Sequence, residues 1–302
     1  MFKLFSPRAL AAVVLAVCGS AHALDLAQYQ WTATHALPEV KASEASAVTW
    51  NWDTGSLFVV GDEGEYVVEV NTQGQELSAM RLFGFDDTEG LTYVGNGQFV
   101  VVEERLQSLH LLTYQGGSLA GRAALPSVSI GPTIGNTGLE GASYDRVSGD
   151  LFLVKEKTPQ ALYRTTWDLS STTASTSDLV PRANPFSRLF DTLDLADVQV
   201  LSSVPALQGT AWADRLLVLS QETPRLMVVG LDGQVFSQFD LSGLASDIEG
   251  VTIDAQGTIY LVGETPALYV LSATVPAVPE PSSIALLLAG VAVTAASRIR
   301  RS

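Results

Sequence analysis

The stretch Thr88-Glu89-Gly90-Leu91-Thr92-Tyr93 occurs in three related copies along the chain. The other two copies are Leu139-Glu140-Gly141-Ala142-Ser143-Tyr144 and Ile248-Glu249-Gly250-Val251-Thr252-Ile253. Each copy is followed by a turn and a short apolar run, and an acidic residue comes within two positions of the end of each run. The runs are Phe99–Val102, Leu151–Val154 and Ile259–Val262. A unit that recurs in this way is the signature of a repeat architecture.

Two weaker copies complete the series. Ser46–Trp50 precedes the apolar run 57–60, and Ala196–Val200 leads into the run 216–219. Successive copies are 43, 51, 56 and 53 residues apart when they are aligned at Ser46, Glu89, Glu140, Ala196 and Glu249. A propeller blade of four strands has a period of about 40–50 residues. The spacing therefore predicts five blades, with loop insertions in the longer repeats.

The apolar runs have the character of strands. They are short, rich in Val, Leu, Ile and aromatic residues, and bounded by turn residues such as Asn96-Gly97 and Asp232-Gly233. Runs that are apolar throughout indicate burial on both faces, which the stacking of blade on blade provides. We therefore predict an all-β fold, a β-propeller of five four-stranded blades, with six blades as the alternative.

The last repeat shows only three strands, near 250–254, 258–262 and 267–272. A strand pattern at Tyr29–Leu37 stands alone before the first repeat. We expect it to supply the missing fourth strand and close the ring, because closure leaves no open sheet edge. The alternative is a loosely attached N-terminal strand. Segments 126–138 and 168–193 are expected to be loops, and the second is expected to lie over a mouth of the channel.

Composition narrows the classes of partner. The chain has 302 residues, is 47% hydrophobic and 16% charged, and carries a formal net charge of −15. Between residues 24 and 278 there are 12 basic and 31 acidic residues, or −19. This charge disfavours nucleic acid and anionic membrane surfaces as partners and favours cations. Solubility alone also accounts for it.

The two ends of the chain have the composition of targeting segments. Residues 1–23 resemble a signal peptide, with Lys3 and Arg8 before an apolar centre and Ala21-His22-Ala23 as the cleavage site. The only cysteine, Cys18, lies within it. Residues 276–302 contain the apolar stretch 284–296 and a basic end, and thirteen residues are few for a transmembrane helix, which needs about 20. The domain between them is expected at 24–275.

Carboxylates recur at equivalent positions of the repeats. The start of the first strand and the end of the second share one face, because the two strands are antiparallel neighbours. Glu89, Glu140 and Glu249 are therefore expected to ring the mouth of the channel. Further acids are expected on the same face, with Asp87 and Asp194 close by; they are Asp62, Glu103, Glu104, Glu156 and Glu264.

Such a cluster of hard oxygen ligands suits Ca²⁺, which takes 6–8 oxygens, and these eight acids are our candidate ligands. Zinc is disfavoured, because His35 and His110 fall in what read as outer strands. The alternative is that each glutamate caps backbone N–H groups and binds no ion. No nucleophile or metalloprotease motif is present. Arg105, Lys155 and Lys157 either pair with the acids or hold a phosphate beside a metal.

The segment Asp87–Tyr93, followed by Phe99–Arg105, resembles the SdiA-regulated (YjiK/CarP-like) family, and the similarity extends over roughly residues 30–272. The resemblance implies a secreted or periplasmic β-propeller linked to calcium and sometimes described as phytase-like. On this pattern Glu89, Glu103, Glu104, Glu140 and Glu249 would carry an ion site. Ser46 and Ala196 replace glutamate in two copies and break the five-fold ring.

The tail Val278-Pro279-Glu280-Pro281-Ser282-Ser283, with its apolar stretch and basic end, resembles the PEP-CTERM sorting signal. That resemblance implies an exosortase-type processing enzyme as a partner. It also implies transient insertion in the inner membrane, followed by release or display at the cell surface. A plain C-terminal anchor is the alternative.

Three functional hypotheses follow. The first is an exported, surface-sorted, calcium-binding propeller that acts as a binding or signalling module. The second is a calcium-dependent hydrolase of phosphate esters or lactones. The third is an extracellular matrix or adhesion scaffold that uses its rim loops. An extracellular polymer or a small molecule is a possible ligand in the first and third hypotheses.

Overall fold

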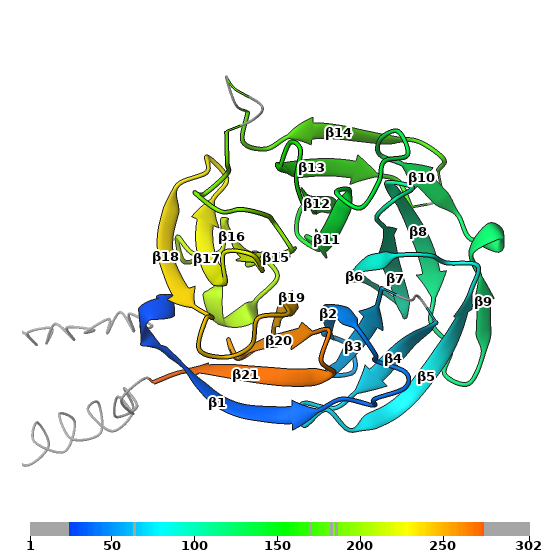
Figure 1. Cartoon of the computed structure of the whole chain (residues 1–302), viewed down its shortest axis with the longest axis horizontal. Coiled ribbons are helices and arrows are strands. Elements are labelled where there is room, and N and C mark those ends of the chain that lie inside the picture. The colour runs from blue at the N-terminus through cyan, green and yellow to red at the C-terminus, as the bar shows by residue number, and fades with distance from the viewer. Residues whose placement is uncertain (1–23, 63–64, 170, 182–183, 185–186, 275–302) are drawn as a thin grey trace, which may run out of the picture. The chain divides into compact units, whose positions relative to one another are not determined.

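The computed structural model describes residues 24–62, 65–169, 171–181, 184 and 187–274. The expected signal peptide and the C-terminal sorting segment lie outside these residues. The described chain forms five largely antiparallel sheets arranged around a central channel (Figure 1). The five-bladed propeller predicted from the repeat spacing is therefore confirmed, and six blades are excluded.

Blades one and two contain the first two copies of the repeat. Blade one comprises β2 Ala45–Asn51, β3 Ser56–Gly61, β4 Tyr66–Val70 and β5 Glu76–Phe83. Blade two comprises β6 Thr88–Gly95, β7 Gln98–Glu103, β8 Ser108–Thr113 and β10 Ser127–Ser129. A short strand between them in sequence, β9 Leu119–Gly121, pairs in parallel with β5 and extends blade one outward.

Blades three and four follow the same plan. Blade three comprises β11 Leu139–Tyr144, β12 Asp150–Lys155, β13 Ala161–Trp167 and β14 Ala174–Asp178. Blade four comprises β15 Asp197–Val200, β16 Arg215–Ser220, β17 Arg225–Gly230 and β18 Val235–Asp240. Within the described residues, three single-turn 3₁₀ helices lie outside the blades: η1 Leu26–Gln28, η2 Arg122–Ala124 and η3 Pro205–Leu207.

Blade five is completed by the N-terminal strand. Its three inner strands come from the C-terminal end of the domain: β19 Ile248–Ile253, β20 Ile259–Gly263 and β21 Ala267–Ala273. The N-terminal strand β1 Tyr29–Ala36 forms the outer edge. β1 pairs antiparallel with β21 from Tyr29 opposite Ala273 to Ala36 opposite Ala267. The ring is thus closed by residues from the two ends of the domain, as the sequence predicted.

Two segments expected to be loops supply outer strands instead. β10 lies within 126–138 and pairs with β8, and β14 lies within 168–193 and pairs with β13. The residues of β14 are polar and mostly exposed, so the segment has no apolar alternation that would reveal a strand in the sequence. The segment becomes a strand because it pairs with the free edge of β13.

The apolar core lies between neighbouring blades. One cluster, for example, joins Val48, Leu57 and Val68 of blade one to Tyr260 and Leu268 of blade five. All of these side chains are at least nine-tenths buried. This packing explains the uniformly apolar runs, because each middle strand contacts a different blade on each face.

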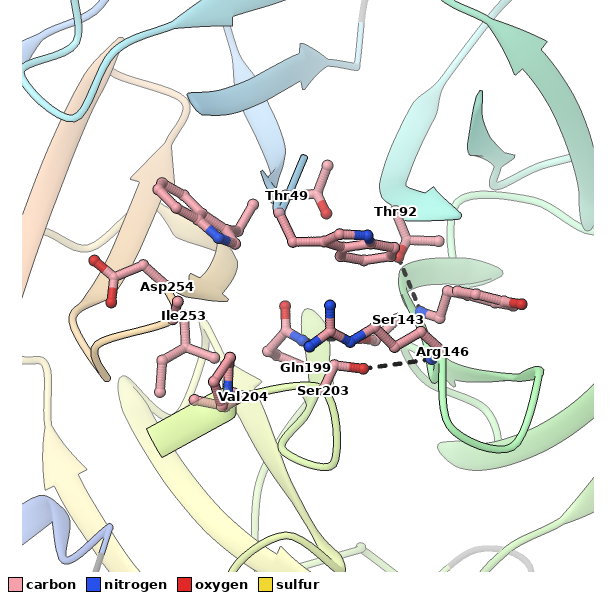
Figure 2. A pocket seen from close by; sticks show the side chains of 14 residues that line it. Thr49, Thr92, Ser143, Arg146, Gln199, Ser203, Val204, Ile253 and Asp254 are labelled. Atoms are coloured by element: carbon pink, nitrogen blue, oxygen red, sulfur yellow. Dashed lines mark hydrogen bonds between the residues drawn. The ribbon is translucent and has the colours of Figure 1, made fainter. Parts of the chain in front are cut away.

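The threonine or serine of the repeated motif joins one blade to the next. The hydroxyl of Thr92 accepts the backbone N–H of Tyr144 at 2.9 Å, as Figure 2 shows at this end of the channel. Equivalent bonds run from Tyr93 N to Thr49, from Val200 N to Ser143 and from Trp50 N to Thr252, at 3.0–3.2 Å. In blade four Gln199 takes the equivalent position and accepts the hydroxyl of Thr252.

The glycine of the motif is required by the close approach of adjacent blades. A Cβ on Gly141 would lie 2.1 Å from Oδ1 of Asp197, and one on Gly90 would lie 2.6 Å from the carbonyl oxygen of Glu140. Neither distance is compatible with a side chain, so the inner strands can pack against each other only where the Cβ is missing.

Candidate metal centre

An acidic cavity of about 310 Å³ occupies the end of the channel at which the inner strands begin. Its lining contains nine carboxylates against one arginine among the described residues. The acids are Asp62, Asp87, Glu89, Glu104, Glu140, Glu156, Asp194, Glu249 and Glu264, and the arginine is Arg105. Seven of the eight acids that the sequence nominated as ligands are among them, and Glu103 is the exception.

β-Bulges direct the motif glutamates into this cavity. In blade two Thr88 pairs with Glu103 and Gly90 pairs with Val102, so Glu89 is left over in the ladder. The same shift occurs at Glu249 in blade five and between Leu139 and Ala142 in blade three. A bulge re-aims the extra residue, and here that places each glutamate on the channel axis rather than against a neighbouring blade.

A second set of acids comes from the ends of the second strands. The residue that directly follows β3, β7, β12 and β20 is acidic and lines the cavity in each case; these residues are Asp62, Glu104, Glu156 and Glu264. In blade four Gln221 takes this place. The preceding residue points away, because successive side chains of an extended chain alternate between faces.

Glu103 is therefore not part of the acidic cavity, contrary to the clustering expected from the sequence. Its fully buried carboxylate lies 3.0 Å from Nε2 of His110 and 2.6 Å from a guanidinium nitrogen of Arg122. The backbone N–H of Asp86 also donates to it at 3.0 Å. Burial raises the pKa of Glu103, but the hydrogen bonds from His110, Asp86 and Arg122 outweigh that effect and hold it below its usual value. This residue stabilises blade two.

The electrostatics of the cavity oppose full ionisation. Burial is the largest cause that raises the pKa of Glu89 and Glu140 well above the usual value, and neighbouring carboxylates add to it. Burial and the charge of Glu264 raise the pKa of Glu249 to about 8. Burial and a contact with Asp87 raise the pKa of Glu104 to about 7. Near neutral pH the cavity must therefore hold protons or attract a cation.

Two trios of carboxylates are close enough to share an ion. One consists of Asp62, Asp87 and Glu89, and the other of Glu104, Glu140 and Glu156. Within each trio, ligand oxygens lie within 4.8 Å of one another. All donors are hard oxygens, and no thiol or imidazole lines the cavity among the described residues. This donor set fits Ca²⁺ or Mg²⁺ and disfavours zinc.

Glu104 provides the clearest sign of a missing partner. Its side chain is 1% exposed, and Oε1 accepts the backbone N–H of Gly138 at 2.7 Å. Oε2 is buried and receives no hydrogen bond from an N–H or hydroxyl group of the described residues; further polar neighbours of this carboxyl are the carboxyls of Asp87 and Glu140. A buried carboxylate oxygen without a donor is costly, and a cation would satisfy it.

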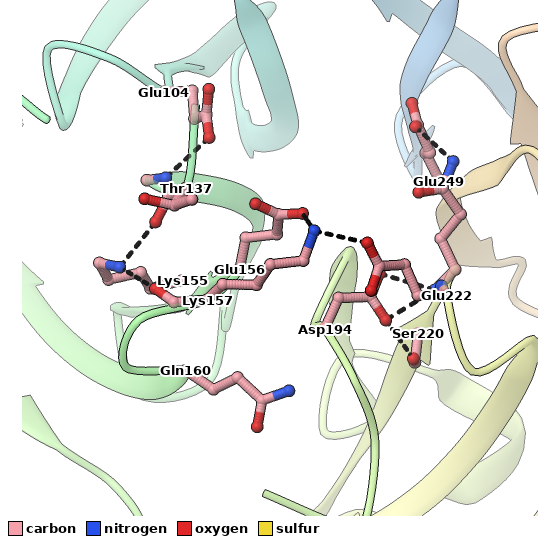
Figure 3. Close-up of polar contacts among 12 residues, drawn as sticks. Glu104, Thr137, Lys155, Glu156, Lys157, Gln160, Asp194, Ser220, Glu222 and Glu249 are labelled. Carbon is pink, nitrogen blue, oxygen red and sulfur yellow. Dashed lines mark hydrogen bonds and ion pairs between the residues drawn. The ribbon is translucent and has the colours of Figure 1, made fainter. Parts of the chain in front are cut away.

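The cationic side chains near the cavity are already engaged. Arg105 Nε lies 2.9 Å from Asp87 Oδ2. Lys157 joins Glu156 at 2.5 Å to Glu222 at 2.7 Å, as Figure 3 shows. Lys155 instead donates to the backbone carbonyls of Thr137, at 2.6 Å, and Lys157. The expected pairing with acids thus holds for Arg105 and Lys157 but not for Lys155.

Sequence reasoning missed the neutral members of the lining. Asn136 comes from the segment after β10, and Gln221 follows β16. Gln221 donates to Glu249 at 2.8 Å. Asp194, at the end of the 168–193 connection, accepts the backbone N–H groups of Gln221 and Glu222 and so caps the turn after β16. A neutral residue at the position of an acid does not extend the pattern of carboxylates, so the sequence does not mark it.

In the described part of the chain no helix has the length and apolar character needed to cross a membrane. Two family models match the sequence: SdiA-regulated over residues 21–272 and the PEP-CTERM protein-sorting motif over residues 277–301. The sorting motif implies export and membrane-associated sorting.

Solved structures agree on the architecture. Glutaminyl cyclase of Myxococcus xanthus superposes with a TM-score of 0.56 at 12% identity, covering 81% of this chain and 95% of that one. The WD40 β-propeller domain of Doa1 has a TM-score of 0.50 at 10% identity, with 81% and 96% covered. At these identities the likeness concerns the fold alone. The family match spans nearly all of the propeller, and the chain belongs to the SdiA-regulated family.

Proposed function

We propose that this protein is an exported, surface-sorted β-propeller that binds Ca²⁺ in its acidic cavity and acts as a binding module. The observation that carries the proposal is the trio Glu104, Glu140 and Glu156, with a buried oxygen of Glu104 that lacks a donor. The sorting motif supports export, and processing by an exosortase-type enzyme followed by surface display is part of the proposal.

The energetics favour a cation over the alternative of simple capping. Two unit charges 4.8 Å apart repel by about 3 kcal/mol at an effective dielectric of 20. Each trio contains three such pairs, and one acid of each trio has a cationic partner among the described residues: Asp87 pairs with Arg105, and Glu156 pairs with Lys157. One divalent ion replaces this repulsion with attraction to every member. Ca²⁺ is preferred to Mg²⁺ because it accepts 6–8 oxygens in irregular geometry, whereas Mg²⁺ requires an octahedron.

The structure gives the hydrolase alternative less support. A phosphate ester would need free cations beside the metal, and Arg105 and Lys157 are held in ion pairs with cavity or rim acids. The adhesion-scaffold alternative needs no ion. A titration of the metal-free protein with Ca²⁺ therefore distinguishes it from our proposal.

The test is a thermal melt of the purified protein, stripped with chelator and then titrated with Ca²⁺ or Mg²⁺. Ligand at 100 times its Kd stabilises a protein by about 2.7 kcal/mol, or roughly 5–10 °C in a domain of this size. We expect a saturable rise that prefers Ca²⁺, is abolished in Glu89→Gln/Glu140→Gln and persists in the exposed control Glu39→Gln. No rise in the wild-type protein refutes the ion site and leaves the acids as caps.

A further inference from the structure

A second pocket of about 110 Å³ lies at the opposite end of the channel, where the inner strands finish. All five blades contribute to it, and Ser203, Val204 and Pro205 of the blade-four insertion form one wall (Figure 2). Its composition differs from that of the acidic cavity: Trp50 and Trp52 line it together with Arg146, and Asp254 is its only acid among the described residues.

The acceptors around this pocket are already used. The hydroxyls of Thr49, Thr92 and Ser143 accept backbone N–H groups of the next blade. Asp254 is 5% exposed; its Oδ1 accepts the backbone N–H groups of residues 256 and 258, and its Oδ2 accepts the hydroxyl of Tyr260. The negative charge of Asp254 is therefore directed into its own turn rather than toward a ligand.

Two donors of the same pocket, one buried and one exposed, are available to a ligand. Nε1 of Trp50 is buried and has no hydrogen-bond partner among the described residues. The guanidinium of Arg146 has no carboxylate partner in the described part of the chain and lies 5.4 Å from the centre of the Trp52 ring. Figure 2 shows the Arg146 side chain extending across the pocket toward Gln199. The Arg146 side chain is exposed, so its guanidinium is available to a ligand that enters the pocket.

We propose that this second pocket binds a small organic carboxylate with an aromatic or apolar body. The guanidinium of Arg146 and the indole N–H of Trp50 are donors, and an ionised carboxylate accepts from both with charge-assisted bonds. The face of Trp52, with Val204 and Ile253, covers the apolar body of the ligand. An inorganic anion would leave these apolar walls unused, and a neutral sugar would find few free acceptors for its hydroxyls.

Benzoate is the probe, and benzamide is its neutral isostere. Binding to the purified protein is measured by tryptophan fluorescence and ligand-observed NMR, both in chelator and in Ca²⁺. We expect benzoate to bind saturably and benzamide to bind about tenfold more weakly or worse, because a hydrogen bond to a charged group contributes about 1.5–3 kcal/mol. Arg146→Gln should weaken benzoate about tenfold or more, and Trp50→Phe several-fold. Arg81→Gln, an exposed arginine on β5, is the matched control and should bind as wild type.

Three results overturn the proposal. The first is the absence of benzoate binding to wild-type protein that is shown to be folded by its thermal melt. The second is equal affinity for benzoate and benzamide, or equal affinity of wild type and Arg146→Gln. The third is inorganic phosphate binding as tightly as benzoate, which would make this a plain anion site. Because the pocket shares no residue with the acidic cavity, failure here does not affect the Ca²⁺ proposal, and the reverse also holds.

Discussion

Glu103 and Glu104 are adjacent, acidic and buried, yet the structure predicts opposite effects when each is replaced by glutamine. Glu104 faces the acidic cavity, where burial and Asp87 raise its pKa from 4.5 to about 7. Glu103 faces His110 and Arg122, and its pKa is lowered. Glutamine has the same shape as glutamate and keeps an oxygen for the N–H of Gly138, so the substitution removes the charge with little change in packing.

The magnitude follows from linkage between protons and folding. A pKa that is higher in the folded state means that folded protein binds more protons, so stability falls as pH rises from about 4.5 to about 7. Each pKa unit corresponds to about 1.4 kcal/mol, which gives about 3 kcal/mol for Glu104. Without metal, Glu104→Gln should therefore be about 3 kcal/mol more stable than wild type at pH 8 and equal to it near pH 4.

Glu103→Gln should be destabilised by about 3 kcal/mol at pH 8, because it leaves Arg122 beside an uncharged buried partner. The lowered pKa of Glu103 means that its contribution is present above about pH 4.5 and is lost as the pH falls further. The contrast between the two variants should thus be largest at pH 8 and disappear in acid.

Urea unfolding in chelator at several pH values measures both variants against wild type. The same unfolding measurement is then repeated in Ca²⁺. The free energy of unfolding should rise for wild type and Glu103→Gln and change little for Glu104→Gln. The reasoning is refuted if Glu104→Gln is destabilised by the same amount at every pH, since that behaviour belongs to a structural cap and not to a cavity acid.

Three further predictions concern the ring and its mouth. Gly141→Ala should destabilise by about 3 kcal/mol or prevent folding, because its Cβ would meet Asp197 at 2.1 Å, whereas Gly121→Ala has open space and should be nearly neutral by the same denaturation assay. Thr92→Val should cost about 1–3 kcal/mol by leaving the buried N–H of Tyr144 without an acceptor, and an unchanged unfolding midpoint would contradict the role of the hydroxyl. The metal-free protein should lose stability from pH 5 to pH 8 as the cavity glutamates ionise, including one with a pKa of about 8, and saturating Ca²⁺ should flatten this loss in pH-dependent melts.

The repeat motif predicts the fold because each of its residues has one structural task that recurs in the three full copies, in blades two, three and five. The glutamate occupies the bulge, the glycine allows close approach, and the threonine or serine bonds to the next blade. Because these tasks are local and repeat from blade to blade, the motif can be recognised in the sequence. The closing strand at Tyr29–Ala36 was predictable for a similar reason, since the last repeat lacked one strand.

The outer strands were not predictable in this way. β14 consists largely of polar, exposed residues, β10 is only three residues long with Val128 as its one buried side chain, and β9 joins blade one although it lies between two strands of blade two in sequence. Such segments have little burial pattern of their own. They become strands because a paired edge offers hydrogen bonds, which is a property of the assembled sheet.

The sequence by itself determined the five blades, the closure of the ring and the gathering of acids at one mouth, since these depend on period and composition. Only the tertiary structure decided which acids face the channel. Glu103 and Glu104 are adjacent acids after the same apolar run, but a one-residue step along an extended chain reverses the side-chain direction, so that only Glu104 lines the cavity. The pocket with Trp50 and Arg146 likewise depends on residues from five blades that come together only in the closed ring.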